Sequence, residues 1–474
     1  MPALRGSLEL RDRRILVVGL ARTGIAAARF LLEQGARVAA TDCAASVGSD
    51  PAVKALGENG CSLRLGEHRL EDFLEAELIV ISPGVPLTLA PLSEAVKAGR
   101  TVIGEMELAS RHLPCPLIGV TGSNGKTTTV SLIHAMLESA SIPHWVGGNI
   151  GRPLIDFLLE GRERSEKPRF VVAEVSSFQL ETVCSLRPWI AVWTNLSEDH
   201  LDRYPDLEAY AEAKFRIFQN QTADDYAIVP ARDRWLDFRR NRMAARIVRF
   251  GCPGDGRPEA CVDGAKIVWR GADRTAEELY ETERVRLPGR HNLENMMVAA
   301  AVARLCGVPP PIVQRAMDTF PGLEHRLELV EEIRGVRFYN DSKGTTVDSV
   351  VRALESFSRP VLLLAGGKDK GGAYAPLLEP LRTRARRLFL FGEAAGRMER
   401  ELSGAVPIER VRDLDEAIRR SWEEARPGDV VLLSPACSSF DMFRDYEHRG
   451  ETFKQGVRDL VGRVRGSEEA GGEP

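Results

Sequence analysis

The fold is decided by the stretch Gly119-Val120-Thr121-Gly122-Ser123-Asn124-Gly125-Lys126-Thr127-Thr128. An apolar segment, residues 116–120, comes before the loop and predicts a buried strand, and an apolar-periodic segment after it predicts a helix. A glycine-rich loop between strand and helix directs backbone N–H groups at an anion, and its Lys-Thr pair supplies a cation and a magnesium ligand. The stretch therefore predicts a phosphate site for ATP or GTP, formed by Gly122, Ser123, Asn124, Gly125, Lys126, Thr127 and Thr128.

The spacing of this loop departs from the strict Walker pattern. Val120 stands where the opening glycine of the standard motif belongs, and Gly119 comes one residue early. An ordinary glycine-rich turn between strand and helix is the alternative interpretation, and the sequence context favours the nucleotide.

Composition narrows the class of protein. A chain of 474 residues with a formal net charge of -4 has room for about three domains and no general electrostatic attraction for nucleic acid or an anionic membrane. No segment has the length and apolarity of a transmembrane helix, and the charged N-terminus is unlike a signal peptide. The eight cysteines form no C-x-x-C pair, which favours reduced thiols. We therefore expect a cytoplasmic protein that binds neither nucleic acid nor membrane.

Upstream of the loop the chain begins as a Rossmann-like unit. Residues 14–19 predict a strand, 25–34 a helix and 37–41 a second strand that ends at Asp42. Ala21 stands where a dinucleotide fingerprint has the glycine that lets the backbone approach a pyrophosphate. The residues alone leave open NAD or FAD, another nucleotide diphosphate, and a purely structural turn.

A second turn is expected at the same edge of this sheet. Ser82, Pro83 and Gly84 follow the apolar strand 78–81, so they lie where open parallel sheets bind ligands. A plain type II turn explains the same residues equally well.

Two strand ends downstream of the phosphate loop carry residues suited to metal chemistry. Glu174 follows strand 169–173 and either holds magnesium or sits at the entry of the next helix. His200 follows strand 190–194, where a metal or substrate role and a simple loop hydrogen bond are both open.

The remaining chain completes a three-domain α/β organisation. Asn292 and Asn295 lie one turn apart at the start of an alanine-rich helix, where they either cap the helix or reach a ligand. The Phe-Pro-Gly turn at 320–322 indicates a domain boundary, after which strand and helix patterns alternate again. We predict a Rossmann-like domain at 1–104, a central P-loop domain with a mostly parallel sheet at 105–322, and a Rossmann-like α/β domain at 323–474. The charged, glycine-containing tail 465–474 predicts disorder.

These motifs together resemble one family. The sequences T-G-S-N-G-K-T-T at 121–128, E-V-S-S-F-Q-L at 174–180, N-L-S-E-D-H-L-D-R-Y at 195–204, G-R-H-N-L-E-N at 289–295, N-D-S-K-G-T-T at 340–346 and L-S-P-A-C-S-S-F-D-M-F at 433–443 are similar to those of the Mur ligases of peptidoglycan synthesis. The resemblance covers nearly the whole chain, and the shortened phosphate loop is the family's own variant. The serine motif at 433–443 resembles the members that add D-glutamate. A Mur-type ligase for another amino acid is the alternative.

The resemblance implies an ATP-dependent amide ligase. Its expected substrates are UDP-N-acetylmuramoyl-L-alanine and D-glutamate, and ATP converts the acceptor carboxylate to an acyl phosphate that the amine attacks. ATP and two Mg²⁺ are the implied cofactors. A monomer is expected, with the third domain closing over the second to bring amine and acyl phosphate together.

The same resemblance implies roles for individual residues. Lys126, Glu174, His200 and Lys214 would be catalytic, with Thr127, Glu174, His200 and Lys214 as metal ligands. Asn292, Asn295, Arg326 and Asp341 would join the phosphate loop in binding ATP. Contacts to the UDP-sugar and to D-glutamate would come from Arg22, Thr23, Asp42, Ser82, Pro83, Gly84, Asn149, Lys343, Thr345, Ser439 and Phe440. Tyr446 stands where the family often has Phe.

The residues alone and the family resemblance imply different roles for Lys214. Its place in the helical stretch 209–218 predicts only an exposed or snorkelling lysine. The family match implies that this lysine reacts with carbon dioxide to form a carbamate, an oxygen donor of the kind that magnesium prefers.

Two other classes fit only part of the chain. A nicotinamide dehydrogenase would explain the first domain but not the phosphate loop. A non-catalytic nucleotide switch would explain that loop but not the strand-end motifs in all three domains.

Overall fold

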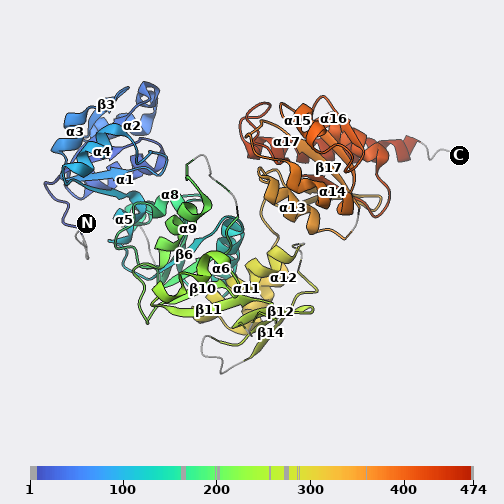
Figure 1. Cartoon of the computed structure of the whole chain (residues 1–474), viewed down its shortest axis with the longest axis horizontal. Coiled ribbons are helices and arrows are strands. Elements are labelled where there is room, and N and C mark those ends of the chain that lie inside the picture. The colour runs from blue at the N-terminus through green and yellow to red at the C-terminus, as the bar shows by residue number, and fades with distance from the viewer. Residues whose placement is uncertain are drawn as a thin grey trace. The chain divides into compact units, whose positions relative to one another are not determined.

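The computed structural model describes residues 8–161, 167–197, 199, 203–252, 254–255, 258–271, 277–285, 287, 289–358 and 360–470, without the side chains of 465–470. The described residues form an α/β protein with three separate sheets (Figure 1). Most neighbouring strands run parallel, which confirms the predicted fold class.

The first sheet has five parallel strands in the order β3-β2-β1-β4-β5. The strands are β1 (Arg14–Val18), β2 (Arg37–Asp42), β3 (Ser62–Leu65), β4 (Leu78–Ile81) and β5 (Thr101–Gly104). The helices are α1 (Arg22–Glu33), α2 (Pro51–Glu58), α3 (Leu70–Glu75) and α4 (Ala90–Lys97). The chain adds β2 and β3 on one side of β1 and then β4 and β5 on the other side, so the loops after β1 and β4 meet at a topological switch point.

The second sheet has nine strands in the order β14-β13-β12-β11-β10-β9-β6-β8-β7. The strands are β6 (Leu117–Thr121), β7 (His144–Gly148), β8 (Phe170–Glu174), β9 (Ile190–Trp193), β10 (Tyr226–Pro230), β11 (Arg246–Gly251), β12 (Ala260–Asp263), β13 (Lys266–Trp269) and β14 (Glu278–Glu281). Only the β12-β13 and β13-β14 pairs are antiparallel. β6 lies between β8 and β9, so the phosphate loop that follows β6 lies beside the ends of both neighbours.

Helices accompany this sheet along the chain. They are α5 (Glu105–Ser110), α6 (Lys126–Ser139), α7 (Asp156–Glu160), α8 (Ser177–Leu180), α9 (Leu207–Phe215) with the 3-10 turn η2 (Arg216–Phe218), α10 (Arg234–Asp237), α11 (Arg290–Leu305) and α12 (Pro310–Thr319). α6 begins directly at Lys126, as the loop-to-helix pattern predicts.

The third sheet has the order β15-β16-β20-β17-β18-β19, parallel except for the β15-β16 pair. The strands are β15 (Glu328–Ile333), β16 (Val336–Asn340), β17 (Val361–Gly366), β18 (Ala385–Phe391), β19 (Ile408–Arg410) and β20 (Val430–Leu433). The helices are α13 (Val347–Glu355), α14 (Leu378–Arg384), α15 (Ala395–Glu401), α16 (Leu414–Glu424) and α17 (Tyr446–Ala470). β20 lies between β16 and β17, which places the loops after these three strands at one edge.

Helix α17 includes the first part of the stretch 465–474, because it continues to Ala470. The predicted disorder of this tail stays a prediction. Residues 471–474 lie outside the described residues.

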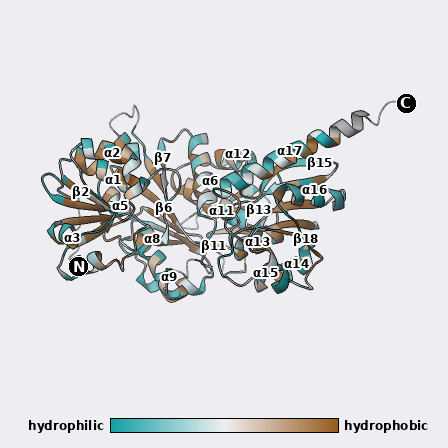
Figure 2. Cartoon of the chain, turned by 90° about the horizontal axis from the view of Figure 1, so that it is seen from above, coloured by the Kyte–Doolittle hydropathy of each residue, from teal (hydrophilic) through white to brown (hydrophobic). Residues whose placement is uncertain are grey.

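Apolar strands form the cores. Every residue of β4, β6, β8, β9, β17 and β20 is buried, as expected for parallel strands covered on both faces. Figure 2 shows the labelled strands largely in brown and helices such as α1 and α2 in mixed colours, the pattern of amphipathic helices on a sheet. Of the helices that the structure describes, none combines the length and apolarity needed to cross a membrane.

The described residues pack as two compact units. One consists of Met1–Thr282 with Glu294–Met317, and the other of Glu283–Leu293 with Asp318–Pro474. The first unit contains both the first and the second sheet, because one hydrophobic core runs from residues such as Val17 and Phe30 to Leu154 and Val171. The predicted boundaries at 104 and 322 stay predictions.

Helix α5 follows the predicted boundary at 104 and is fixed by two buried carboxylates. Glu105 Oε1 accepts from the N–H of Ile155 at 2.6 Å, and burial raises the pKa of Glu105 to about 7. Glu107 accepts from the backbone of Cys184 and Leu186 and pairs with the buried Arg111. Helix α5 is thus tied by carboxylate hydrogen bonds to the backbone at Ile155 and at 184–186.

Candidate active site

The phosphate loop follows β6 and depends on two glycines with positive φ. Gly122 has φ 145° and Gly125 has φ 82°, and Gly125 forms the N-cap of α6. A Cβ at Gly122 would overlap Thr194 Oγ1, and one at Gly125 would overlap Asn295 Oδ1. Glycine is therefore required at both positions by conformation and by space. The backbone N–H groups at the start of α6 are the anion-binding end of a helix.

The loop is braced by the segment that follows β9. Asn195 Oδ1 accepts from the N–H of Asn124 at 3.0 Å, and Asn195 Nδ2 donates to Asn124 O at 3.0 Å. Thr194 Oγ1 donates to the same carbonyl at 2.7 Å. Ser123 Oγ donates to Ser197 O at 3.0 Å and lies 3.3 Å from the Tyr210 hydroxyl. These side chains hold the loop in its cradle shape.

Lys126 lies across its own loop. Its Nζ donates to the carbonyl oxygens of Gly122 and Ser123, both at 2.8 Å. The ammonium group is therefore held against the backbone of the phosphate loop at Gly122 and Ser123.

Glu174 is the buried carboxylate beside this loop. It ends β8, is 2% exposed, and accepts from Thr127 Oγ1 and from Asn149 Nδ2, both at 2.8 Å. Three predicted site residues, Thr127, Asn149 and Glu174, thus meet at the ends of β6, β7 and β8. Their oxygen atoms are hard donors that suit Mg²⁺.

Lys214 enters the same cluster from α9. It is 1% exposed, its Nζ donates to Gly122 O at 2.9 Å, and it lies 4.6 Å from the centre of the Tyr210 ring. Burial, and then the positive charge of Lys126, lower the pKa of Lys214 well below its usual value. An exposed helix lysine, which its spacing alone predicts, is thus excluded.

The remaining predicted site residues of the second sheet lie on helices α6 and α11, except for His200. Asn295 is buried in α11, where its Oδ1 accepts from Thr129 Oγ1 at 3.3 Å. Thr128 is buried in the first turn of α6, and Asn292 is buried one turn before Asn295. His200 lies outside the described residues.

The two loops of the first sheet meet as expected from its switch point. Ser82 Oγ donates to Gly19 O at 2.8 Å, and Asp42 accepts from the N–H of Leu20 at 2.7 Å and of Ala44 at 2.8 Å. Asp42, at the end of β2, therefore holds the loop after β1 through its hydrogen bond to Leu20.

The surface of this switch point carries further predicted residues. Arg22 and Thr23 open α1 and are exposed and half-buried, respectively. Gly84 is exposed, and Pro83 O accepts from Arg203 Nη1 at 3.1 Å. The 82–84 turn is thereby linked to the end of the N-L-S-E-D-H-L-D-R-Y motif.

In the third sheet, Asp341 follows β16 and is buried. Its carboxylate accepts from Ser434 Oγ at 2.7 Å and from the N–H of Leu327 at 3.3 Å. Burial raises the pKa of Asp341 to about 7, and the nearby Arg326 acts in the opposite direction. Asp341 thus connects the loops after β16 and β20 with the segment before β15.

The predicted amino-acid residues lie at this same edge. Lys343 Nζ donates to the Tyr446 hydroxyl at 3.1 Å and lies 4.8 Å from the centre of its ring. Thr345 accepts from Lys370 Nζ through its carbonyl at 3.1 Å and its hydroxyl at 3.3 Å. Ser439 is 2% exposed and Phe440 is 68% exposed. The set therefore combines lysine cations with hydroxyls on three neighbouring loops.

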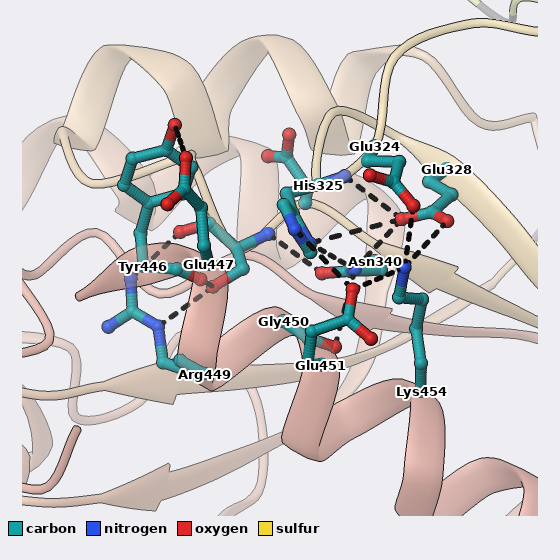
Figure 3. Close-up of polar contacts among 12 residues, drawn as sticks. Glu324, His325, Glu328, Asn340, Tyr446, Glu447, Arg449, Gly450, Glu451 and Lys454 are labelled. Atoms are coloured by element: carbon teal, nitrogen blue, oxygen red, sulfur yellow. Dashed lines mark hydrogen bonds and ion pairs between the residues drawn. The ribbon is translucent and has the colours of Figure 1, made fainter. Parts of the chain in front are cut away.

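The first turns of α17 support these loops from behind. The fully buried Arg449 donates to Ser342 Oγ at 3.0 Å and Ser342 O at 2.8 Å, and to Cys437 O at 3.2 Å. Figure 3 shows Arg449 and Tyr446 on the same helix as Gly450, Glu451 and Lys454. A Cβ at Gly450 would overlap the His325 ring, so glycine lets that ring lie against the helix. His325 O in turn accepts from the N–H of Lys343 at 3.1 Å.

Sequence reasoning missed this supporting set and the brace of the phosphate loop. Thr194, Asn195 and Tyr210 lie in quoted motifs or predicted elements, but their roles depend on contacts between distant positions. Lys370 lies in a glycine-rich loop after β17, where strand-end placement was the available signal. Arg449 gave no signal beyond its helix.

Comparison with known proteins places these features in a family. Residues 13–104 match the Mur ligase MurD-like, N-terminal domain, 120–303 the Mur ligase middle domain, and 325–437 the Mur ligase, glutamate ligase domain. The chain is 45% identical to the UDP-N-acetylmuramoylalanine--D-glutamate ligase of Geotalea uraniireducens over 96% of this chain and 99% of that one. It is 46% identical to the same-named enzyme of Pelobacter propionicus over 96% of this chain and 100% of that one.

Solved structures share the fold at lower identity. The Thermotoga maritima MurF ligase in complex with ADP has a TM-score of 0.59 at 17% identity, covering 96% of this chain and 98% of that one. A pseudomurein peptide ligase type C from Methanothermus fervidus has a TM-score of 0.58 at 17% identity, covering 95% of this chain and 100% of that one.

Proposed function

The chain belongs to the Mur ligase family, and from that premise we propose that it joins D-glutamate to UDP-N-acetylmuramoyl-L-alanine at the expense of ATP. ADP and phosphate are the other products, and the setting is peptidoglycan precursor synthesis in the cytoplasm. The observation that carries the proposal is the hydrogen bond from Thr127 to the buried Glu174, beside a phosphate loop that Lys126 spans, in a chain 45% identical to a ligase of that name.

The reaction needs an activated carboxylate. The terminal carboxylate oxygen of the UDP-sugar substrate attacks the γ-phosphorus of ATP, and ADP leaves. The D-glutamate nitrogen then attacks the acyl carbon of the resulting acyl phosphate, loses a proton, and expels phosphate. Each step concentrates negative charge, so positioning and cationic groups dominate the rate. Lys126 and the N–H groups at the start of α6 supply the positive charge that balances this negative charge.

Magnesium fits the residues at the loop. Thr127 Oγ1 and Glu174 offer oxygen atoms, and the carboxylate is buried among hydrogen-bond donors. When bound, Mg²⁺ neutralises phosphate charge. We propose Thr127 and Glu174 as ligands of one ion and His200, with a modified Lys214, as ligands of a second.

The proposed modification of Lys214 is a carbamate. A neutral amine nitrogen forms a bond to the carbon of CO₂ and releases one proton, which converts the side chain into a carboxylate-like anion. Support comes from the burial of Lys214 and its lowered pKa, because both favour the neutral amine that reacts. Its place beside Gly122 would bring the new oxygens to the phosphate loop.

We assign nucleotide and substrate contacts in the same way. The adenine, ribose and phosphates of ATP would be contacted by Asn292, Asn295, Arg326 and Asp341. The uridine diphosphate would meet the switch point of the first sheet, at Arg22, Thr23, Asp42 and the 82–84 turn, with Asn149 nearer the reacting end. D-Glutamate would meet Lys343, Thr345, Ser439 and Phe440.

Phosphate release with matched substrates tests the proposal. Each UDP-muropeptide is combined with ATP and each of several amino acids, and release is expected only with UDP-N-acetylmuramoyl-L-alanine and D-glutamate. Release with another amino acid would assign the chain to a different Mur-type ligase. Release without any amino acid would indicate a nucleotide switch.

Lys343→Ala is expected to raise the KM for D-glutamate by about 10- to 100-fold, the effect of losing one charged hydrogen bond. The KM values for ATP and for the UDP-sugar should change little. Steady-state kinetics with each of the three substrates varied in turn measures this. An equal rise in all three KM values would instead assign Lys343 a structural role, and good turnover of L-glutamate would undo the substrate assignment.

Tyr446→Phe is expected to raise the KM for D-glutamate by about 2- to 10-fold with kcat nearly unchanged, because one neutral hydrogen bond is lost. The Tyr446 hydroxyl accepts from Lys343 Nζ and donates to Glu447 Oε1 at 2.8 Å, so it fixes the ammonium that would bind a carboxylate. Initial-rate kinetics checks the split. Tyr226→Phe, the same chemical change in β10, serves as the control, and an unchanged KM in Tyr446→Phe would refute the positioning role.

A further inference from the structure

A cluster of two histidines and a glutamate closes the turn between α6 and β7. His134 and Glu138 lie one helical turn apart in the last part of α6, and His144 opens β7. One ligand atom from each residue lies within 4.8 Å of the other two. His134 Nδ1 and His144 Nε2 are 2.7 Å apart.

The hydrogen bonds of His144 direct a lone pair into this cluster. His144 Nδ1 lies 2.7 Å from Ile142 O, and a carbonyl oxygen can only accept, so Nδ1 carries the hydrogen. The Nε2 of the neutral ring is then an acceptor that faces His134 Nδ1. A backbone carbonyl that fixes the far nitrogen of an imidazole is the usual support of a metal-binding histidine.

The surrounding charge also suits a cation. Glu138 supplies a carboxylate, and the cluster lies in the last turns of α6, where the helix dipole attracts positive charge. Two imidazoles and a carboxylate are donors that favour Zn²⁺ and related ions over Mg²⁺.

A second cluster of one histidine and two glutamates has a similar composition but already contains a cation. Glu324, His325 and Glu451 also bring their ligand atoms within 4.8 Å of one another. There, however, Lys454 Nζ lies 2.6 Å from Glu451, 3.1 Å from Glu324 and 3.4 Å from Glu328 (Figure 3). The lysine ammonium already fills the position of a cation in that cluster.

We propose that His134, Glu138 and His144 form a binding site for one divalent transition-metal ion of the Zn²⁺ class, separate from the magnesium sites of the ligase reaction. His134 Nδ1, His144 Nε2 and a Glu138 oxygen are the three protein ligands, and solvent completes the coordination. The neutral His134 ring moves its hydrogen to Nε2 when the ion replaces the hydrogen bond between the rings.

The ion would join the end of the phosphate-loop helix to the start of the strand that leads to Asn149. Ser141, in the connecting turn, has φ 52°, a left-handed conformation that a bound ion would help to hold. The expected role is stabilisation of this helix–strand unit, and it does not depend on the proposed ligase activity.

Titration of the full-length protein with Zn²⁺ and with Co²⁺, in excess Mg²⁺ to occupy oxygen-donor sites, tests the proposal. One equivalent of Zn²⁺ should bind by calorimetry, Co²⁺ should give the absorption of nitrogen and oxygen ligands, and Tm should rise with Zn²⁺ concentration. His134→Ala and His144→Ala should each weaken Zn²⁺ binding by about tenfold or more, and Glu138→Gln by less.

His68→Ala is the matched control, since His68 lies in the first sheet region and contacts Thr41 Oγ1 at 2.9 Å. It should bind Zn²⁺ as the parent does. His134 is exposed, so His134→Ala should keep the metal-free Tm of the parent and isolate the loss of a ligand. Any one of three results would overturn the site: no Zn²⁺ binding by the parent, Zn²⁺ binding unchanged in both histidine variants, or Co²⁺ absorption that indicates thiolate ligands.

Discussion

Lys126→Ala is expected to lower kcat by about 100- to 1000-fold, the effect of removing one donor from developing charge in a preorganised site. Lys126 begins α6, and its Nζ lies at the curve of the phosphate loop, held by the carbonyls of Gly122 and Ser123. Alanine keeps the helix but leaves the transferring phosphoryl group without this cation. ATP-dependent phosphate release with both other substrates saturating measures the change.

Lys266→Ala is the matched control for this variant. Lys266 is a half-exposed lysine that pairs with Glu281 on the antiparallel edge of the same sheet. It should retain parental kcat, and both variants should keep a Tm close to that of the parent. Near-normal turnover in Lys126→Ala would remove Lys126 from the reaction.

Lys214→Ala and Lys214→Arg are both expected to lower kcat by about 100-fold or more, because neither can form a carbamate that serves as a metal ligand. Arginine keeps the positive charge, so its failure would show that a cation is not what the site needs. The parent enzyme should also lose activity in buffer freed of CO₂ and regain it with bicarbonate. Initial rates under both conditions check this.

Carbon-13 NMR with labelled bicarbonate gives an independent measurement of the modification. A carbamate signal should be present in the parent and absent from both Lys214 variants, with Lys266→Ala as a folded control that keeps the signal. Full activity of Lys214→Ala, or a parent that shows no such signal while active, would refute the carbamate.

The buried central strands of the three sheets could be predicted because a parallel strand covered on both faces is apolar along its whole length. Residues 78–81 were predicted as a strand with the bounds that the structure has. The strands β12, β13 and β14 were not predicted, since strands of only four residues give little pattern.

In the candidate site, too, some residues could be predicted from the sequence and others could not. Lys126, Thr127 and Glu174 could be found because each stands at a strand end, where topology brings neighbouring loops together. The brace formed by Asn195 could not, since it joins positions that are 71 residues apart. Arg449 contacts Ser342 across 107 positions, so only the packed structure shows its part in the amino-acid loops.

The carbonyl of Gly122 links the half-buried Lys126 to the buried Lys214, since both lysines donate to it. The charge of Lys126 lowers the pKa of Lys214, so any ligand that draws Lys126 away or neutralises it raises the proton affinity of Lys214. Thermodynamic reciprocity then requires that a change in the charge of Lys214 alter the affinity for that ligand by the same factor. Nucleotide occupancy and the chemical state of Lys214 are thus linked by a single coupling free energy.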